Sequence, residues 1–178
     1  MPRIAYAHRL FFALMPPAGL LDELARLRDR ETQGRAEADD RLHITMFLFD
    51  RDPEFQSATA TRIFQVLDGQ SLPRCRVAFE QLVRGKGSTL LLPSDKLDGV
   101  LRLQRCLAML LRTSDMHAAS CWRFNPHMTL RRGKAVGETI AIDAVSWTAH
   151  EIVLLDSLIG LTQYNEIGRW PLTKNENR

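Results

Sequence analysis

A histidine and a threonine two positions apart, set within an apolar run, occur twice in this chain. His43 and Thr45 lie in the run LHITMF, and His127 and Thr129 lie in the run FNPHMTL. On an extended chain, side chains alternate between two faces. Each imidazole therefore shares a face with a hydroxyl, while apolar side chains take the opposite face. The chain is expected to contain two half-buried strands, each with one polar His–Thr face.

The number of such pairs argues against coincidence. With five His in 178 residues and about eleven Thr, the His-x-Thr pattern is expected roughly 0.3 times by chance. Taken alone, each His also fits an ordinary half-buried strand residue that hydrogen-bonds to its neighbouring Thr. Two triplets, each inside an apolar run, instead favour a single site shared by both.

The order of expected elements around the two triplets is the same. Residues 9–50 read as strand, helix and strand with His-x-Thr, and residues 88–132 repeat that order. The two His are 84 positions apart, since 127 − 43 = 84. This predicts a diverged internal duplication within one bilobal domain spanning residues 1–178. Equivalent strands would then face each other across a central cleft, with one His from each lobe.

The remaining elements follow from apolar periodicity and turn residues. Helices are expected after Pro16-Pro17, from about Glu54 to Leu67, and from Ser94 to about Arg112. The segment RGKGS at 84–88 is expected to be a hairpin turn between two strands, because it lacks the spacing of a phosphate-binding loop. Strands are expected near residues 9–15, 41–50, 72–83, 89–92, 126–131, 140–147, 151–158 and 161–169.

Composition limits the class of protein. The chain is 45% hydrophobic and 25% charged, and its apolar runs are too short to span a membrane. The N-terminus has no apolar segment of signal-peptide length. Three cysteines without C-x-x-C spacing fit reduced thiols, which predicts a cytoplasmic protein. All but four of the 24 basic residues are Arg, whose planar fork suits phosphate, although a GC-rich genome would give the same bias.

Two histidines facing one site, with no recognisable nucleophile, suggest acid–base catalysis. Near neutral pH, one imidazole can accept a proton while the other donates one. The hydroxyls of Thr45 and Thr129 suit phosphoryl oxygens, and preplaced donors would stabilise the charge that develops on phosphorus. This chemistry needs no metal and no cofactor. His117 and Cys121 are four apart, but no second pair stands at the spacing of a structural zinc site.

At these residues the chain resembles the 2H phosphoesterase superfamily, and most closely its LigT-like branch, the RNA 2′,3′-cyclic phosphodiesterases historically called 2′-5′ RNA ligases. The matching motifs span nearly the whole sequence. They are RLFFAL from Arg9 followed by Pro16-Pro17, the two His-x-Thr runs, and Tyr164 with Arg169-Trp170-Pro171-Leu172. The chain departs from the family pattern at Arg41, where Asn is common, at Leu48-Phe49, where Gly usually follows Leu, and at Asn125.

The resemblance implies an α/β (α+β) fold of two pseudo-symmetric lobes, each of mainly antiparallel sheet with helices outside. It also implies hydrolysis of a 2′,3′-cyclic phosphate on RNA or a nucleotide to a 2′-phosphate without metal. His43 would protonate the departing 3′ oxygen and His127 would activate water. Thr45, Thr129 and Arg132 would hold the phosphate. Arg131, the neighbour of Arg132, is expected on the face opposite to Arg132 by strand alternation. Phe11 and Phe47 are candidate stacking surfaces for a base, although the sequence favours burial in the core for both.

Two other functions stay open from the sequence. The same side chains serve a nucleotide-binding or RNA-binding module without turnover, and they also serve 2′-5′ ligation of RNA ends, the reverse type of reaction. The expected partners are RNA ends or nucleotides bearing a 2′,3′-cyclic phosphate, with no membrane partner. Nothing in the sequence requires more than a monomer.

Overall fold

The computed structural model describes residues 7–134 and 137–174. Within them the chain forms two five-stranded sheets, with strand orders β3-β1-β9-β10-β4 and β2-β7-β6-β5-β8, here called the first and second sheets. The helices and strands are β1 His8–Leu14, α1 Leu21–Asp29, β2 Arg35–Ala36, β3 Ile44–Leu48, α2 Ser57–Leu67, β4 Leu72–Pro73, β5 Cys75–Arg84, β6 Ser88–Leu92, α3 Asp98–Arg112, β7 Met128–Arg132, β8 Glu138–Ala149, β9 Glu151–Leu158 and β10 Gln163–Thr173.

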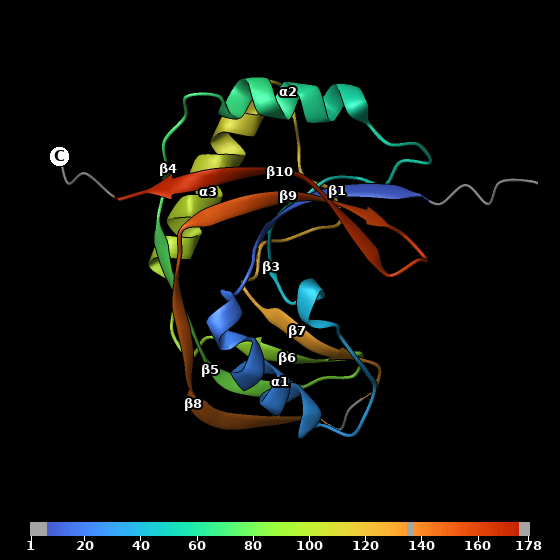
Figure 1. The fold of residues 1–178 in the computed structure, drawn as a ribbon, viewed down its shortest axis with the longest axis vertical. Helices are drawn as coiled ribbons and strands as arrows, with labels where there is room; N and C mark the ends of the chain where they lie inside the picture. The colour runs from blue at the N-terminus through green and yellow to red at the C-terminus, as the bar shows by residue number, and fades with distance from the viewer. Residues whose placement is uncertain (1–6, 135–136, 175–178) are drawn as a thin grey trace, which may run out of the picture.

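The mixed α+β, bilobal arrangement agrees with the expected fold class. In Figure 1 the two sheets form separate layers, with α2 and α3 against the first sheet and α1 in front of the second. Neighbouring strands are antiparallel in the described residues, except that β10 pairs with β4 in parallel. The segment between β5 and β6 is the expected hairpin turn, closed by a hydrogen bond from Gly85 N to Ser88 O of 2.8 Å.

The helix of each strand–helix–strand unit contacts the sheet of the other unit. β1 and β3 pair in the first sheet, yet α1 between them packs toward β7 of the second sheet. β6 and β7 pair in the second sheet, and α3 between them packs against β5 of that sheet and also contacts β3 and β4 of the first sheet. One apolar cluster consequently includes Leu24 of α1, Phe12 of β1 and Leu107 of α3, so the two layers share a core.

The amphipathic pattern of α3 explains its place. Val100, Leu103, Leu107 and Leu111 recur at helical spacing and are all buried. The helix begins at Asp98 rather than at the expected Ser94, whose backbone N–H instead donates to Glu80 Oε2 at 3.0 Å. Other differences from expectation are small. The strand expected over 72–83 is divided into β4 and β5, and the short β2 has no apolar pattern that would predict it.

Both His-x-Thr strands carry a β-bulge next to their Thr. In the first sheet, Ala13 pairs with Thr45 and Phe12 with Phe47, so Met46 is the extra residue. In the second sheet, Leu90 pairs with Thr129 and Thr89 with Arg131, so Leu130 is the extra residue. A bulge reverses the alternation of side chains beyond it. The residues that follow each Thr therefore lie on different faces from those that strict alternation predicts.

Candidate active site

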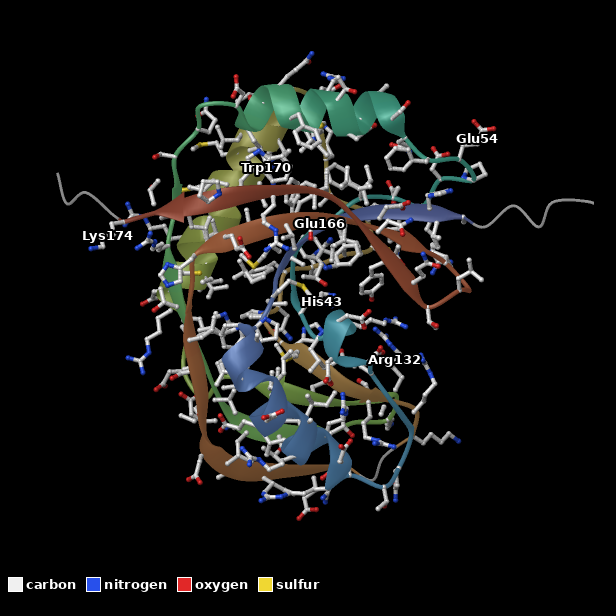
Figure 2. All side chains as sticks on the ribbon, viewed as in Figure 1. His43, Glu54, Arg132, Glu166, Trp170 and Lys174 are labelled. Carbon is white, nitrogen blue, oxygen red and sulfur yellow. The ribbon has the colours of Figure 1, made fainter. Side chains whose placement is uncertain are left out.

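The two histidines occupy equivalent positions in the fold. His43 immediately precedes β3, and His127 immediately precedes β7. Both strands lie at or near one end of their sheets, each paired with the strand that opens its own strand–helix–strand unit. Figure 2 places His43 between the two layers, with Arg132 extending from the second sheet on the same side of the molecule.

Both imidazole rings are oriented by the same hydrogen bond. His43 Nδ1 lies 2.6 Å from Arg41 O, and His127 Nδ1 lies 2.7 Å from Asn125 O. A carbonyl oxygen only accepts, so Nδ1 carries the proton in each ring. Each His therefore has Nε2 available to exchange a proton. The alternative that each His hydrogen-bonds to its neighbouring Thr is not what the structure shows.

Partial burial among aromatic rings keeps His43 neutral. Its ring packs between Phe11, at a centroid distance of 5.1 Å, and Tyr164, at 5.5 Å. This removal from water lowers the pKa of His43 from 6.5 to about 4. The bond to the Arg41 carbonyl and the charge of Glu37 oppose the shift, while the charges of Arg132 and His127 add to it.

Thr45 and Thr129 offer unengaged hydroxyls. Both side chains are partly buried, at the equivalent ladder positions opposite Ala13 and Leu90. Within the part of the chain that the structure describes, neither hydroxyl makes a hydrogen bond that meets ordinary geometry. Hydroxyls held on a strand without internal partners are suited to bind oxygens of a ligand.

A buried carboxylate organises two arginines beside His43. Glu37 is only 2% exposed, and it forms an ion pair with Arg132 and a second with Arg41, whose Nε lies 3.3 Å from Glu37 Oε2. Arg41 also donates to Thr162 O at 3.0 Å and lies 4.7 Å from the centre of the Tyr164 ring. Arg132 is itself exposed, so part of its guanidinium remains open to an anion.

Comparison with known proteins identifies the family. A family model described as the 2'-5' RNA ligase superfamily matches residues 16–158, which is most of the chain. The chain belongs to the 2'-5' RNA ligase superfamily. This agrees with the 2H phosphoesterase resemblance of the two His-x-Thr motifs. A search of curated proteins by sequence gives no match.

Solved structures share the fold of this superfamily member. Escherichia coli LigT complexed with 3'-AMP superposes with a TM-score of 0.76 at 21% identity, covering 94% of this chain and 99% of that one. TT0787 of Thermus thermophilus gives 0.72 at 18% identity, over 94% and 99%. The MHV ns2 PDE domain gives 0.51 at 16% identity, over 81% and 97%. These similarities show that the chain shares the fold of LigT and of the other two structures.

The two predicted stacking residues are not open to a base. Phe47 is 2% exposed and packs against Phe49 and Trp122, because the bulge at Met46 turns it to the face opposite Thr45. Phe11 lies on the face that carries His43, but it is 3% exposed beneath His43 and Tyr164. Both residues are core positions, as the sequence favours, and the stacking candidates Phe11 and Phe47 are wrong. The partly exposed aromatic ring beside His43 is Tyr164.

Arg132 lies on the same face of β7 as Thr129 because of a β-bulge that the sequence pattern does not predict. Strict alternation from Thr129 would put Arg131, and not Arg132, on the face of Thr129. The bulge at Leu130 exchanges them. Arg131 instead donates to backbone oxygens of Gln33 at 2.8 Å and Gly34 at 2.6 Å.

Sequence reasoning missed Glu37, and it treated Arg41 only as a departure from the family pattern. Glu37 lies in the polar connection before the first motif, where no periodicity marks a residue as buried. The signal that was available is the combination of an unusual Arg41 with an acid four positions earlier.

Among the described residues, no group of three His, Cys, Asp or Glu side chains is arranged to hold a metal ion. No helix in that part of the chain is long and apolar enough to cross a membrane.

Proposed function

We propose that this protein hydrolyses 2′,3′-cyclic phosphates at RNA ends or on nucleotides to 2′-phosphates, by acid–base catalysis between His43 and His127. The observation that carries the proposal is the matched pair of imidazoles. Each is fixed through Nδ1 to a carbonyl two residues earlier, and each leaves Nε2 available. LigT of E. coli, which shares the fold, has been crystallised with 3'-AMP, ATP and phosphate, which supports a nucleotide phosphate as ligand.

In the proposed reaction, one imidazole accepts a proton from water as the water oxygen bonds to phosphorus. The bond from phosphorus to the 3′ oxygen breaks, and the other imidazole donates a proton to that oxygen. Thr45, Thr129 and Arg132 hold the nonbridging oxygens, where negative charge develops. Water adds across one P–O bond, and the two rings recover their protonation states through solvent.

The pKa of His43 favours a reversal of the roles that the family resemblance implies. A ring with a pKa of about 4 is neutral near pH 7, with its proton on Nδ1 and a lone pair on Nε2. That form accepts a proton and has none to donate at Nε2. We therefore assign His43 as the base that activates water and His127 as the acid that protonates the 3′ oxygen.

A panel of substrates tests the proposed function. Nucleoside 2′,3′-cyclic phosphates, 3′,5′-cyclic nucleotides and a linear phosphodiester are incubated with the protein in excess chelator. We expect turnover of the 2′,3′-cyclic compounds alone, with a 2′-phosphate as product, and loss of turnover in His43→Ala and His127→Ala with folding intact. Tight binding of nucleotides by the parent without turnover would instead establish the binding module.

Ligation is the second candidate, because the same groups serve it by microscopic reversibility. A 5′-hydroxyl of a second RNA would take the place of water. Water at its bulk concentration favours hydrolysis, so we expect 2′-5′ joined product only when donor and acceptor ends are held together on a complementary strand. Gel analysis of such a nicked duplex measures the ratio of joined to hydrolysed ends.

The cellular setting is part of the proposal. Cys75, Cys106 and Cys121 are free thiols, as a reducing compartment requires, and we place the protein in the cytoplasm as a monomer acting on RNA ends.

A further inference from the structure

Two arginines that form no ion pair with an acid in the described residues, Arg9 of β1 and Arg51 after β3, lie close together beside the first sheet. Arg9 shares a face of β1 with Phe11 and Ala13, because β1 pairs with β9 in unbroken register from His8 to Ala13. Arg51 follows β3, and the two residues Asp50 and Arg51 lie opposite Arg9, since His8 and Asp52 form a bridge on one side and Phe49 N donates to Leu10 O on the other.

Neither guanidinium is neutralised within the described residues. Neither forms an ion pair within 4.0 Å, and no hydrogen bond from either side chain meets ordinary geometry. Asp50 is close enough to influence Arg9, but it is exposed and does not pair with it. Like charges opposed across neighbouring strands destabilise a sheet, so this arrangement carries a cost.

Arg9 is also partly withdrawn from water without a replacement partner. Its Nε is buried and has no hydrogen-bond acceptor among the described residues. Desolvation, and then the charge of Arg51, lower the pKa of Arg9 below its ordinary value. An unsatisfied buried donor beside a second positive charge is the arrangement that an anion would relieve.

The position of this pair relative to His43 suggests which anion. Arg9 is two residues from Phe11 along β1, about 7 Å, and the Phe11 ring lies 5.1 Å from the His43 ring. One nucleotide together with an extended Arg side chain can span these two distances. When a 2′,3′-cyclic phosphate occupies the two-His site, the next phosphate of an RNA chain is bonded to the 5′ oxygen of the same ribose.

We propose that Arg9 and Arg51 form a subsite for the phosphodiester on the 5′ side of the terminal nucleotide, so that the substrate is an RNA end rather than a free nucleoside cyclic phosphate. This inference rests on the proposed function for its choice of substrate. The pair itself does not touch the reacting atoms, and it acts by recognising the chain that leads to them.

The test compares three substrates: adenosine 2′,3′-cyclic phosphate, the same nucleotide with a 5′-phosphate, and the dinucleotide ApA ending in a 2′,3′-cyclic phosphate. The parent is expected to show a kcat/KM for the dinucleotide about tenfold above that for the nucleoside. Arg51→Gln, at an exposed position, and Arg9→Gln, checked for folding by circular dichroism, are expected to bring this ratio toward one. Arg105→Gln, which removes an exposed charge from α3, is the matched control and should leave the ratio as in the parent.

A second readout does not need turnover. Calorimetry compares the binding of adenosine 5′-monophosphate with that of adenosine, and the preference for the phosphate should weaken in Arg51→Gln and at higher salt. A dinucleotide ratio of one in the parent, or a ratio unchanged in Arg51→Gln, would overturn the subsite. If the 5′-phosphate raises kcat/KM but the dinucleotide does not, the inference that the substrate is an RNA end is wrong. If no cyclic phosphate is hydrolysed, the proposed function is wrong. The existence of the subsite then depends only on whether calorimetry shows tighter binding of adenosine 5′-monophosphate than of adenosine.

Discussion

The bonds from Nδ1 to the carbonyls of Arg41 and Asn125 fix both imidazoles in one tautomer before any ligand arrives. Such preorganisation matters because a proton must leave and arrive at defined atoms during a single displacement. The surroundings of the two rings nevertheless differ. His43 is enclosed by Phe11 and Tyr164, and this enclosure is what separates its pKa from the ordinary value.

The pH dependence of kcat/KM distinguishes the two role assignments. The free enzyme's essential base must be unprotonated, and its essential acid must be protonated. With His43 as base, log kcat/KM should rise with pH through about 4. With His43 as acid, it should instead fall as pH rises through the same value. Steady-state kinetics on adenosine 2′,3′-cyclic phosphate, begun about half a pH unit below that value and carried upward, measures the sign. An NMR titration of the His43 ring measures its pKa independently of the kinetics.

Replacing Glu37 by Gln tests the role of the buried carboxylate. The change keeps the shape of the side chain but removes the charge that pairs with Arg41 and Arg132. We expect a loss of about 1–3 kcal/mol in the free energy of unfolding, measured by urea denaturation. The pKa of His43 should fall further, because the charge of Glu37 raises it.

The control for that variant is Glu54→Gln, the same chemical change at an exposed position with no ion pair among the described residues. Figure 2 shows Glu54 at the periphery of the molecule, away from His43. Equal losses of stability in the two variants would contradict the account of Glu37.

At the scale of elements, the bulges at Met46 and Leu130 determine which side chains enter the site. They follow from the pairing of β3 with β1 and of β7 with β6. The register of β7 also depends on β2, where Gly34 and Gly133 approach closely. A Cβ added at Gly34 would lie 2.5 Å from Arg132 O, and Gly34 has a φ of +75°.

Gly34→Ala should therefore displace the backbone of Arg132. We expect lower kcat/KM and a lower free energy of unfolding, because the added carbon meets a backbone atom that cannot move independently of β7. Gly69→Ala is the matched control, since Gly69 has a φ of +66° but open space around its Cβ position. It should cost only the strain of the left-handed backbone, about 1–2 kcal/mol, with activity retained. Equal effects of the two variants would contradict the steric explanation.

The sequence predicts the structural features that depend on local periodicity, and it misses those that depend on how strands pair. The His–Thr strands and the buried faces of the helices follow from the spacing of apolar residues. The bulges do not, because an extra residue is defined only against a partner strand, and this is why strict alternation places Phe47 on the wrong face. Glu37 is buried by groups distant in sequence, so its polar neighbourhood gives no sign of its burial.

For the whole molecule, helices α1 and α3 each contact the other unit's sheet, and the two layers share one core. We propose that residues 1–178 form a single bilobal domain and that units 9–50 and 88–132 arose by duplication. The matched order of elements, the matched bulges and the matched positions of the two His support this proposal.

A shared core predicts a single cooperative unfolding transition. Leu24→Ala in α1 and Leu107→Ala in α3 each remove a fully buried side chain from the same cluster. Each should lower stability by about 2–5 kcal/mol while far-UV circular dichroism and tryptophan fluorescence still change together. Two separate transitions, with each substitution affecting one of them, would show that the layers are independent domains.

The measurement that tests the central claim most directly is a double-mutant cycle on kcat for hydrolysis of a 2′,3′-cyclic phosphate, using His43→Ala, His127→Ala and the double variant. Residues that act as a unit have strongly non-additive effects. We predict that either single substitution lowers kcat about as much as both together, with all three variants folded. If one single variant keeps the parent kcat, or if the two losses multiply in the double variant, the two imidazoles do not act together on one phosphate.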